Sequence, residues 1–164
     1  MPRLISFPPV ADRSATLLIL GSMPGIKSLH AHEYYAHPHN AFWKIMGALI
    51  GATPQLLYPQ RLQTLQQAHI ALWDVLHSCE REGSLDSDIQ AEQANDFASF
   101  FVRHPNITRV CFNGTKAEQS FRRYVAAKQA LPDLHYTRLP STSPAHAGMR
   151  YEEKLAAWRA ALLG

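Results

Sequence analysis

Two polar segments of this chain combine groups that can bind a phosphate with groups that can assist a hydrolysis. The first covers residues 21–40 and opens with the turn Gly-Ser-Met-Pro-Gly at residues 21–25. Two glycines and a proline give a rigid turn whose backbone N–H groups can approach a ligand closely. The second, residues 140–148, carries three consecutive hydroxyl side chains between two prolines. Hydroxyl groups are good phosphate contacts, so both segments are candidates for binding a phosphorylated ligand.

The hydrophobic pattern around these segments predicts strands that alternate with helices. Short apolar runs typical of strands buried on both faces lie at residues 16–20, 70–76, 110–112 and 136–139. Helical periodicity follows over residues 41–50, 55–67, 89–102, a stretch that opens at Thr115, and a last helix with Tyr151, Leu155, Trp158 and Leu162 on one stripe. Helix caps are expected at Asn40, at Asp88 and in a capping box that ends at Glu118.

This alternation predicts an α/β fold with a parallel sheet covered on both faces, because each parallel crossover needs a connection of helical length. In such sheets, ligands bind beyond the carboxyl ends of the strands. The rule selects the four loops at residues 21–40, 77–88, 113–116 and 140–148. A loop of nearly twenty residues in a compact domain is usually functional or disordered, and the aromatic content of residues 21–40 argues against disorder.

Composition places the chain among ordinary globular proteins. Its 164 residues are 46% hydrophobic and 18% charged, contain no repeat or long linker, and are expected to form one domain over residues 1–164. Two cysteines cannot build a four-cysteine zinc site. No apolar stretch approaches the ~18 residues of a membrane span, and prolines interrupt the amino terminus where a signal peptide would be apolar. We therefore expect a cytoplasmic protein without a membrane segment.

The positive charge of the chain is concentrated in one segment. Residues 1–99 hold 6 basic and 9 acidic side chains, whereas residues 100–150 hold 8 basic and 2 acidic ones. Such asymmetry is expected of a surface that faces a polyanion, and it is equally compatible with a helix whose basic face is solvated.

Several motifs together resemble the uracil-DNA glycosylase superfamily, and within it most closely the DNA-deoxyinosine (hypoxanthine-DNA) glycosylases. The resemblance extends from about residue 17 to residue 148. It rests on five segments, which read Gly-Ser-Met-Pro-Gly at 21–25, Tyr-Tyr-Ala-His-Pro-His-Asn-Ala-Phe-Trp at 34–43, Trp-Asp-Val-Leu at 73–76, Ser-Cys-Glu-Arg with Gly-Ser-Leu-Asp-Ser-Asp between 78 and 88, and Ser-Thr-Ser-Pro-Ala at 141–145.

The resemblance implies a three-layer α/β/α sandwich around a short, mainly parallel, four-stranded sheet. It also implies base excision repair, in which the enzyme hydrolyses the N-glycosidic bond of a flipped, deaminated base and leaves an abasic site. Hypoxanthine is the base expected for this branch. The expected partner is damaged DNA, and the resemblance implies no metal, no cofactor and no iron–sulfur cluster, with a monomer as the expected state.

The resemblance also assigns roles to individual residues. Asn40 is the catalytic candidate, because Met23 stands where many relatives place the Asp or Asn that positions water, and a thioether cannot replace it. Ser141 stands where relatives carry a histidine that stabilises the departing base, and Ser22 is grouped with the catalytic residues. Tyr35 is expected to stack on the flipped base. The other expected base contacts are Met23, Gly25, Asp74 and Asn113, and the expected DNA contacts are Ser28, Lys116, Ser143, Ala145 and His146.

The residues leave other interpretations open. Asn40 can serve only as a helix cap, Tyr34 can exchange roles with Tyr35, and Asp74 can be an ordinary turn acceptor instead of binding a base N–H. Four histidines between residues 30 and 39 suggest a metal site, although their spacing is poor for one. Ser22 can be read as a hydrolase nucleophile, although the turn lacks the Gly-x-Ser-x-Gly order. A non-catalytic DNA-binding relative and a uracil or mismatch glycosylase are further alternatives.

Overall fold

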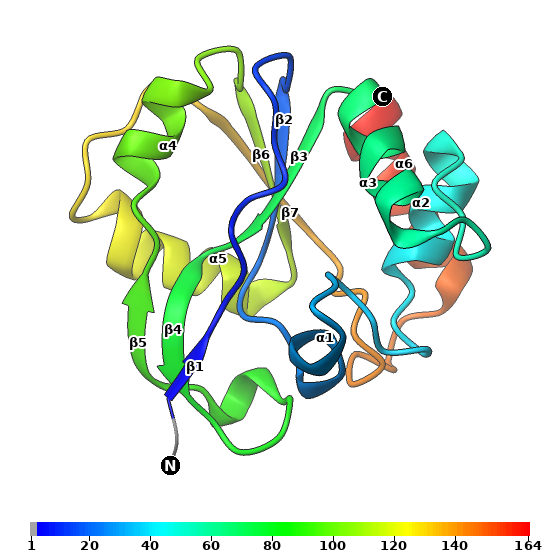
Figure 1. Cartoon of the computed structure of the whole chain (residues 1–164), viewed down its shortest axis with the longest axis horizontal. Helices are drawn as coiled ribbons and strands as arrows, with labels where there is room; N and C mark the ends of the chain where they lie inside the picture. The colour runs from blue at the N-terminus through cyan, green and yellow to red at the C-terminus, as the bar shows by residue number, and fades with distance from the viewer. Residues whose placement is uncertain (1–2) are drawn as a thin grey trace.

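The computed structural model describes residues 3–164, and its centre is a four-stranded parallel sheet (Figure 1). The strands are β2 (Leu17–Gly21), β3 (Ile70–Asp74), β6 (Arg109–Asn113) and β7 (His135–Leu139), in the order β3-β2-β6-β7. Each predicted apolar run contributes one strand, which confirms the parallel sheet. The two inner strands, β2 and β6, are apolar along most of their length because helices cover both faces of the sheet.

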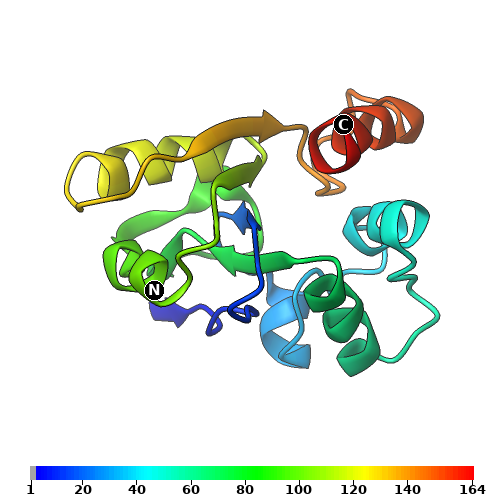
Figure 2. The ribbon, with the colours of Figure 1, turned by 90° about the horizontal axis from the view of Figure 1, so that it is seen from above.

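Helices on the two faces complete the expected three-layer sandwich. One face packs against α2 (Phe42–Ile50), α3 (Tyr58–Gln67) and α6 (Tyr151–Leu163), and the other packs against α4 (Phe97–Arg103) and α5 (Thr115–Phe121). The view from above in Figure 2 separates these layers. Side chains alternate along β2, so that Ile19 packs on the face covered by α2, α3 and α6, and Leu20 packs on the face covered by α4 and α5. The stripe predicted for the last helix is confirmed by Trp158, which is fully buried.

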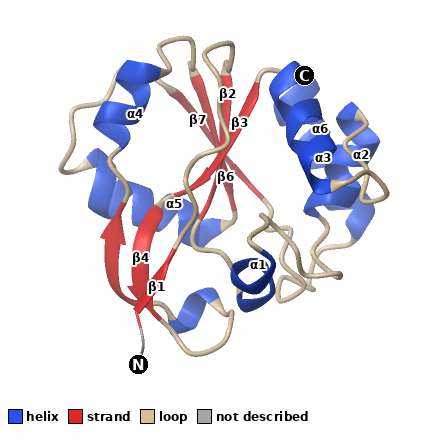
Figure 3. Cartoon of the chain, in the orientation of Figure 1, coloured by secondary structure: helices blue, strands red, loops and turns tan. Residues whose placement is uncertain are grey.

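A second, antiparallel sheet was not predicted. It consists of β1 (Arg3–Ile5), β4 (Leu76–Glu80) and β5 (Gln90–Ala94), in the order β1-β4-β5 (Figure 3). The predicted strand at 70–76 divides at Val75, where the chain leaves the parallel sheet and enters this one. The amide N–H groups of Val75 and Leu76 still bond the carbonyls of Gly21 and Ser22, at 2.8 and 3.1 Å, which fixes the crossing beside the turn at 21–25.

The predicted helix over residues 89–102 is wrong in its first half. Residues 90–94 pair with β4 as an edge strand, so tertiary pairing overrides their helical pattern. The helix begins at Phe97, and its cap is Asp96, whose Oδ1 accepts from Ser99 N at 3.1 Å. Asp88 ends a short 3₁₀ turn instead of capping a helix.

The remaining helix boundaries are close to their predicted positions. α2 ends at Gly51, which has a φ of 84°, and α3 begins three residues later than expected. α5 begins at Thr115 after Gly114, whose φ is 94°, and no side chain caps it, so the predicted capping box does not form. α5 continues into a π-helical turn, Arg122–Ala126. Within residues 3–164, no helix is long and apolar enough to cross a membrane.

Candidate active site

A cleft of about 690 Å³ lies at the carboxyl ends of β2, β3 and β6. Its walls come from Asp74 and from residues within the segments 21–28, 34–40, 84–89, 113–119 and 141–146, which are distant in sequence. All thirteen site residues expected from the sequence line this cleft, namely Ser22, Met23, Gly25, Ser28, Tyr35, Asn40, Asp74, Asn113, Lys116, Ser141, Ser143, Ala145 and His146. The topology therefore brings the motif segments together, and the contacts of each side chain indicate what it can do.

Asn40 uses only one end of its amide within the protein. The N-cap residue of α2 is Ala41, one position after the predicted cap at Asn40. Asn40 Oδ1 still accepts from Phe42 N, the first N–H of the helix, at 2.9 Å. Its Nδ2 has no hydrogen-bond partner in the described chain, and the half-buried side chain lines the cleft. Helix capping and donation to a ligand are thus compatible, because they use different atoms.

Asp74 is a buried carboxylic acid at the end of β3. Asp74 is only 3% exposed, and its Oδ2 has no hydrogen-bond partner within residues 3–164. Burial is the main cause that raises its pKa from the usual 3.8 to about 7, the Asp86 carboxylate raises it further, and Arg81 opposes the shift. Near neutral pH this side chain can therefore carry a proton and offer both a donor and an acceptor to the cleft.

Gly21 allows the close approach of Asp74 and Tyr35. A Cβ atom at this position would lie 2.6 Å from Asp74 Oδ1 and 2.9 Å from the Tyr35 hydroxyl oxygen. Both distances are shorter than real Cβ contacts, so a side chain here would displace one or both groups.

The Gly21→Ala variant is therefore expected to fold but to lose at least tenfold of any activity that depends on this cleft, because misplacement of a catalytic group by ~1 Å can cost 10²-fold. The matched control is Gly148→Ala, where a Cβ meets nothing within 4 Å. Circular dichroism and single-turnover rates of the two variants provide the measurement. Equal rates for both variants would contradict this interpretation of Gly21.

Asn113 joins three parts of the cleft. Its Oδ1 accepts from Thr142 N at 3.0 Å, and its Nδ2 donates to Thr142 Oγ1 at 3.0 Å and to the Tyr35 hydroxyl at 3.1 Å. Both amide hydrogens are therefore already used inside the protein. These partners favour a positioning role over the base contact expected from the sequence. Thr142 is buried and was not among the predicted site residues, because the resemblance assigns roles only to its neighbours Ser141 and Ser143.

The two adjacent tyrosines have different environments. Tyr34 is buried, its hydroxyl donates to Pro8 O at 2.9 Å, and its carbonyl accepts from Trp43 Nε1 at 2.8 Å. Tyr35 is half-buried and stacks on Phe42 with ring centroids 4.1 Å apart. Its φ of 56° is uncommon for a residue with a side chain and turns the chain between the two rings. Tyr35 is therefore the better candidate for a stacking platform.

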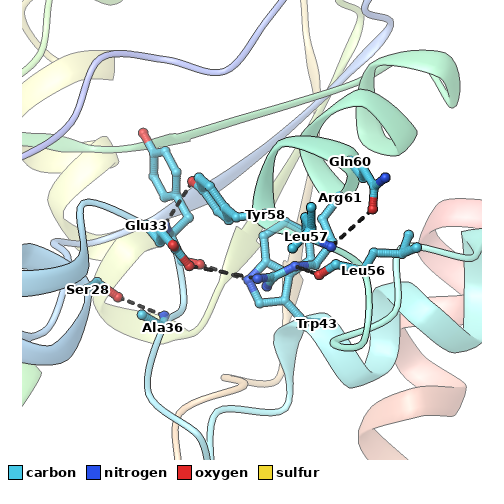
Figure 4. A network of polar contacts seen from close by, with 10 residues as sticks. Ser28, Glu33, Ala36, Trp43, Leu56, Leu57, Tyr58, Gln60 and Arg61 are labelled. Carbon is cyan, nitrogen blue, oxygen red and sulfur yellow. Dashed lines mark hydrogen bonds and ion pairs between the residues drawn. The ribbon is translucent and has the colours of Figure 1, made fainter.

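The long segment at residues 21–40 contains the short helix α1 (Ile26–Ala31). Polar contacts with α1 and α3 hold the rest of this segment in place (Figure 4). Ser28 Oγ accepts from Ala36 N at 3.0 Å, and the Tyr58 hydroxyl accepts from Tyr34 N at 3.0 Å. Glu33 and Arg61 form an ion pair at 3.7 Å. Because Ser28 is buried and its hydroxyl supports the backbone, its contacts favour a structural role over the expected DNA contact.

A second loop, residues 81–86, is fastened to the turn at 21–25. Ser22 Oγ donates to Asp86 Oδ1 at 2.6 Å, and Ile26 N donates to Ser84 Oγ at 2.8 Å. Buried Arg81 donates from Nη2 to Pro24 O at 2.6 Å. The loop at residues 77–88 was expected to lie at the site, but no individual role was predicted for Arg81, Ser84 or Asp86. Within residues 3–164, Ser22 therefore has a carboxylate partner and no histidine partner, which argues against a serine hydrolase.

Met23 and Gly25 contribute walls to the cleft. Met23 is buried in the core that contains Leu20 and Trp73, so it presents apolar surface and no polar contact. Gly25 precedes α1, and a Cβ there would lie 3.2 Å from Ser84 Oγ. The lack of a side chain at Gly25 therefore allows the turn at 21–25 to pack closely against Ser84.

The hydroxyl groups of Ser141 and Ser143 remain available to a ligand. Ser141 Oγ accepts from Ser143 N at 3.1 Å, and Ser143 Oγ accepts from Ala145 N at 3.2 Å. Neither hydroxyl hydrogen has an acceptor in the described part of the chain, so each can donate to a base or a phosphate. Ala145 and His146 are exposed at the rim.

The basic segment does not line the cleft as a whole. Of its eight Lys and Arg residues, only Lys116 lines the cleft, and it forms an ion pair with Glu92 at 3.0 Å. Arg122 and Arg138 instead pair with Glu118. The asymmetry in the sequence therefore reflects mainly other surfaces. Within residues 3–164, no three His, Cys, Asp or Glu side chains form a group that could hold a metal ion.

Known proteins resemble this chain in sequence and in fold. The family description "Uracil DNA glycosylase superfamily" matches residues 8–163. Two curated proteins named hypoxanthine DNA glycosylase, from Methanosarcina barkeri and Methanosarcina acetivorans, are 44% and 43% identical over 112 residues, which is 68% of this chain and 71% of each relative. The solution NMR structure of a candidate uracil DNA glycosylase from Methanosarcina acetivorans has a TM-score of 0.80 at 34% identity, and the match covers 98% of this chain and 97% of that one.

Proposed function

The chain belongs to the uracil DNA glycosylase superfamily and has a DNA glycosylase role in base excision repair, and we propose that the base it removes is hypoxanthine, from deoxyinosine. The relatives that share 43–44% identity carry the name hypoxanthine DNA glycosylase. The observation that carries the proposal is the set of neutral donors that line one cleft with Tyr35. These donors are the Asn40 amide, the Ser141 hydroxyl and the protonated Asp74 carboxyl.

Neutral donors suit the departure of a purine base. Cleavage of the N-glycosidic bond leaves negative charge on the base and positive charge on the sugar, so hydrogen-bond donors aimed at the base lower the barrier. Hypoxanthine presents O6 as an acceptor beside N1–H as a donor. A protonated Asp74 has one donor and one acceptor on the same carboxyl group, which matches this edge. Asn40 Nδ2 and the Ser141 hydroxyl supply further donors.

Base extrusion gives Tyr35 its part in the reaction. A glycosylase takes the nucleotide out of the duplex before it acts on the base, and stacking on an aromatic ring returns ~1–3 kcal/mol. Tyr35 is supported from behind by Phe42 and from its hydroxyl by Asn113. We therefore assign Tyr35 to the base platform and Tyr34 to its support.

Residues at the rim of the cleft supply the expected contacts with the DNA backbone. Ser143 offers a free hydroxyl to a DNA phosphate, and Lys116 contacts a phosphate if its ion pair with Glu92 opens. The residues that carry the assigned roles lie in one cleft of a single chain, which supports our proposal that a monomer is sufficient for the reaction. From the resemblance we further propose that the reaction needs no metal or cofactor and takes place in the cytoplasm.

Release of free base tests the proposal. We expect purified protein to release hypoxanthine from a duplex with one labelled deoxyinosine and to leave an alkali-labile abasic site, with slower release of uracil from the matched deoxyuridine duplex. Deoxyadenosine at the same position is the control. Faster release of uracil would favour the uracil glycosylase alternative, and salt-dependent binding without base release would favour a non-catalytic DNA binder.

A further inference from the structure

Among residues 3–164, Leu85 is the large apolar side chain that both lines the cleft and is exposed, at 51%. The resemblance matches Ala145, His146 and Ala147, on another loop of the rim, to the segment that enters the DNA helix in relatives. Proteins that unstack DNA insert an apolar wedge such as leucine between base steps. Two alanines are too small for this task, so the described rim offers leucine as the better-shaped wedge.

The backbone on both sides of Leu85 is anchored. Ser84 accepts from Ile26 N at 2.8 Å, and Asp86 accepts from Ser22 Oγ at 2.6 Å. Arg81 binds the carbonyl of Gly83 at 2.8 Å and that of Pro24 at 2.6 Å. A fixed backbone gives the exposed side chain a defined direction and avoids the entropic cost of ordering the loop when DNA binds.

The charges around Leu85 restrict what it can contact. Glu82, Asp86 and Asp88 lie in the same segment and are exposed, so this part of the rim repels phosphates. Close contact of this loop with phosphates is therefore disfavoured, and Leu85 is its apolar side chain that can contact the bases.

We propose that Leu85 is the wedge that fills the space left in the duplex when the target nucleotide rotates into the cleft. This role rests on the proposed glycosylase function. It concerns only duplex DNA, because in a single strand no complementary strand leaves a gap that the side chain could fill. Leu85 is thus a positioning residue for extrusion and takes no part in bond cleavage.

The first test compares two substrates. We expect Leu85→Ala to lower single-turnover release of hypoxanthine from a duplex by at least tenfold and to change release from a single strand by less than twofold. Leu85→Met keeps the apolar volume and is expected to retain most duplex activity. Val102→Ala is the matched control, because Val102 is 79% exposed on α4 and does not line the cleft. An equal loss on both substrates, or a loss for His146→Ala and none for Leu85→Ala, would overturn the proposal.

A second measurement separates the wedge from catalysis. The fluorescence of 2-aminopurine placed beside the deoxyinosine should rise when the native protein binds, because its neighbour leaves the stack, and Leu85→Ala should abolish most of this rise at saturating protein. If the native protein gives this rise without releasing base, and Leu85→Ala abolishes the rise, the wedge stands and the proposed glycosylase activity fails. If the native protein gives no rise, or Leu85→Ala gives the full rise, the wedge is refuted.

Discussion

Replacing Asn40 with alanine is expected to lower hypoxanthine release about 10²- to 10³-fold, because one positioned polar group that acts in the transition state is worth ~2.7–4 kcal/mol. Asn40 Nδ2 has no partner in the described chain and lines the cleft, while Oδ1 caps α2. The expected loss is therefore in the rate of the chemical step. Single-turnover rates at saturating protein measure it, and an unchanged rate would remove Asn40 from the mechanism.

Asn40→Asp separates catalysis from helix capping. Aspartate keeps an oxygen that can accept from Phe42 N and loses the amide donor. We expect this variant to unfold at a temperature close to that of the native protein and to lose most of its base release. The alanine variant loses the cap as well, which costs ~1 kcal/mol. High activity in the aspartate variant would show that capping is the main role of Asn40.

Local pattern was sufficient to predict the parallel sheet but not its small antiparallel neighbour. The apolar runs that became β2 and β6 are buried on both faces, and such runs are visible in any sequence. Residues 90–94, Gln-Ala-Glu-Gln-Ala, have no apolar pattern of a strand. They become β5 because β4 presents an open edge beside them, which is a tertiary cause that the local sequence does not contain.

The candidate site shows the same limit at the level of single side chains. Motif residues were predicted to meet because parallel strands end at one edge of the sheet, and the cleft is found at that edge. Their individual contacts were less accessible to prediction. Asn113 and Ser28 have the residue types of ligand contacts, yet their polar atoms are used to hold Thr142, Tyr35 and Ala36.

Asp74 is expected to make the stability of the folded chain fall as pH rises from about 4 to about 7. Its pKa is about 7 in the folded state against 3.8 ordinarily. Between these values the folded state holds a proton that the unfolded state has lost, so the free energy of unfolding falls as the pH rises. The total decrease over this range is at most roughly 4 kcal/mol. Asp74→Asn cannot ionise, and we expect it to be more stable than the native protein at pH 8 and similar to it near pH 4. Urea unfolding at the two pH values measures the difference, with exposed Asp133→Asn as control.

The same Asp74→Asn variant has a second, independent consequence for base release. In the native protein, ionisation above pH 7 removes the carboxyl donor and places a negative charge beside a base that is itself becoming negative. Rates of hypoxanthine release are therefore expected to fall above pH 7. Tyr34, Tyr35, Arg81 and Asp86 remain in the variant, and burial, which is the largest cause, still raises the pKa of both tyrosines, so neither tyrosine accounts for a change in the profile near pH 7. An amide offers one donor group and one acceptor at every pH, so Asp74→Asn should retain activity within about tenfold and lose the decline above pH 7. A native rate that rises through pH 7 would show that Asp74 acts as a carboxylate. A variant that keeps the decline would show that the base does not contact Asp74.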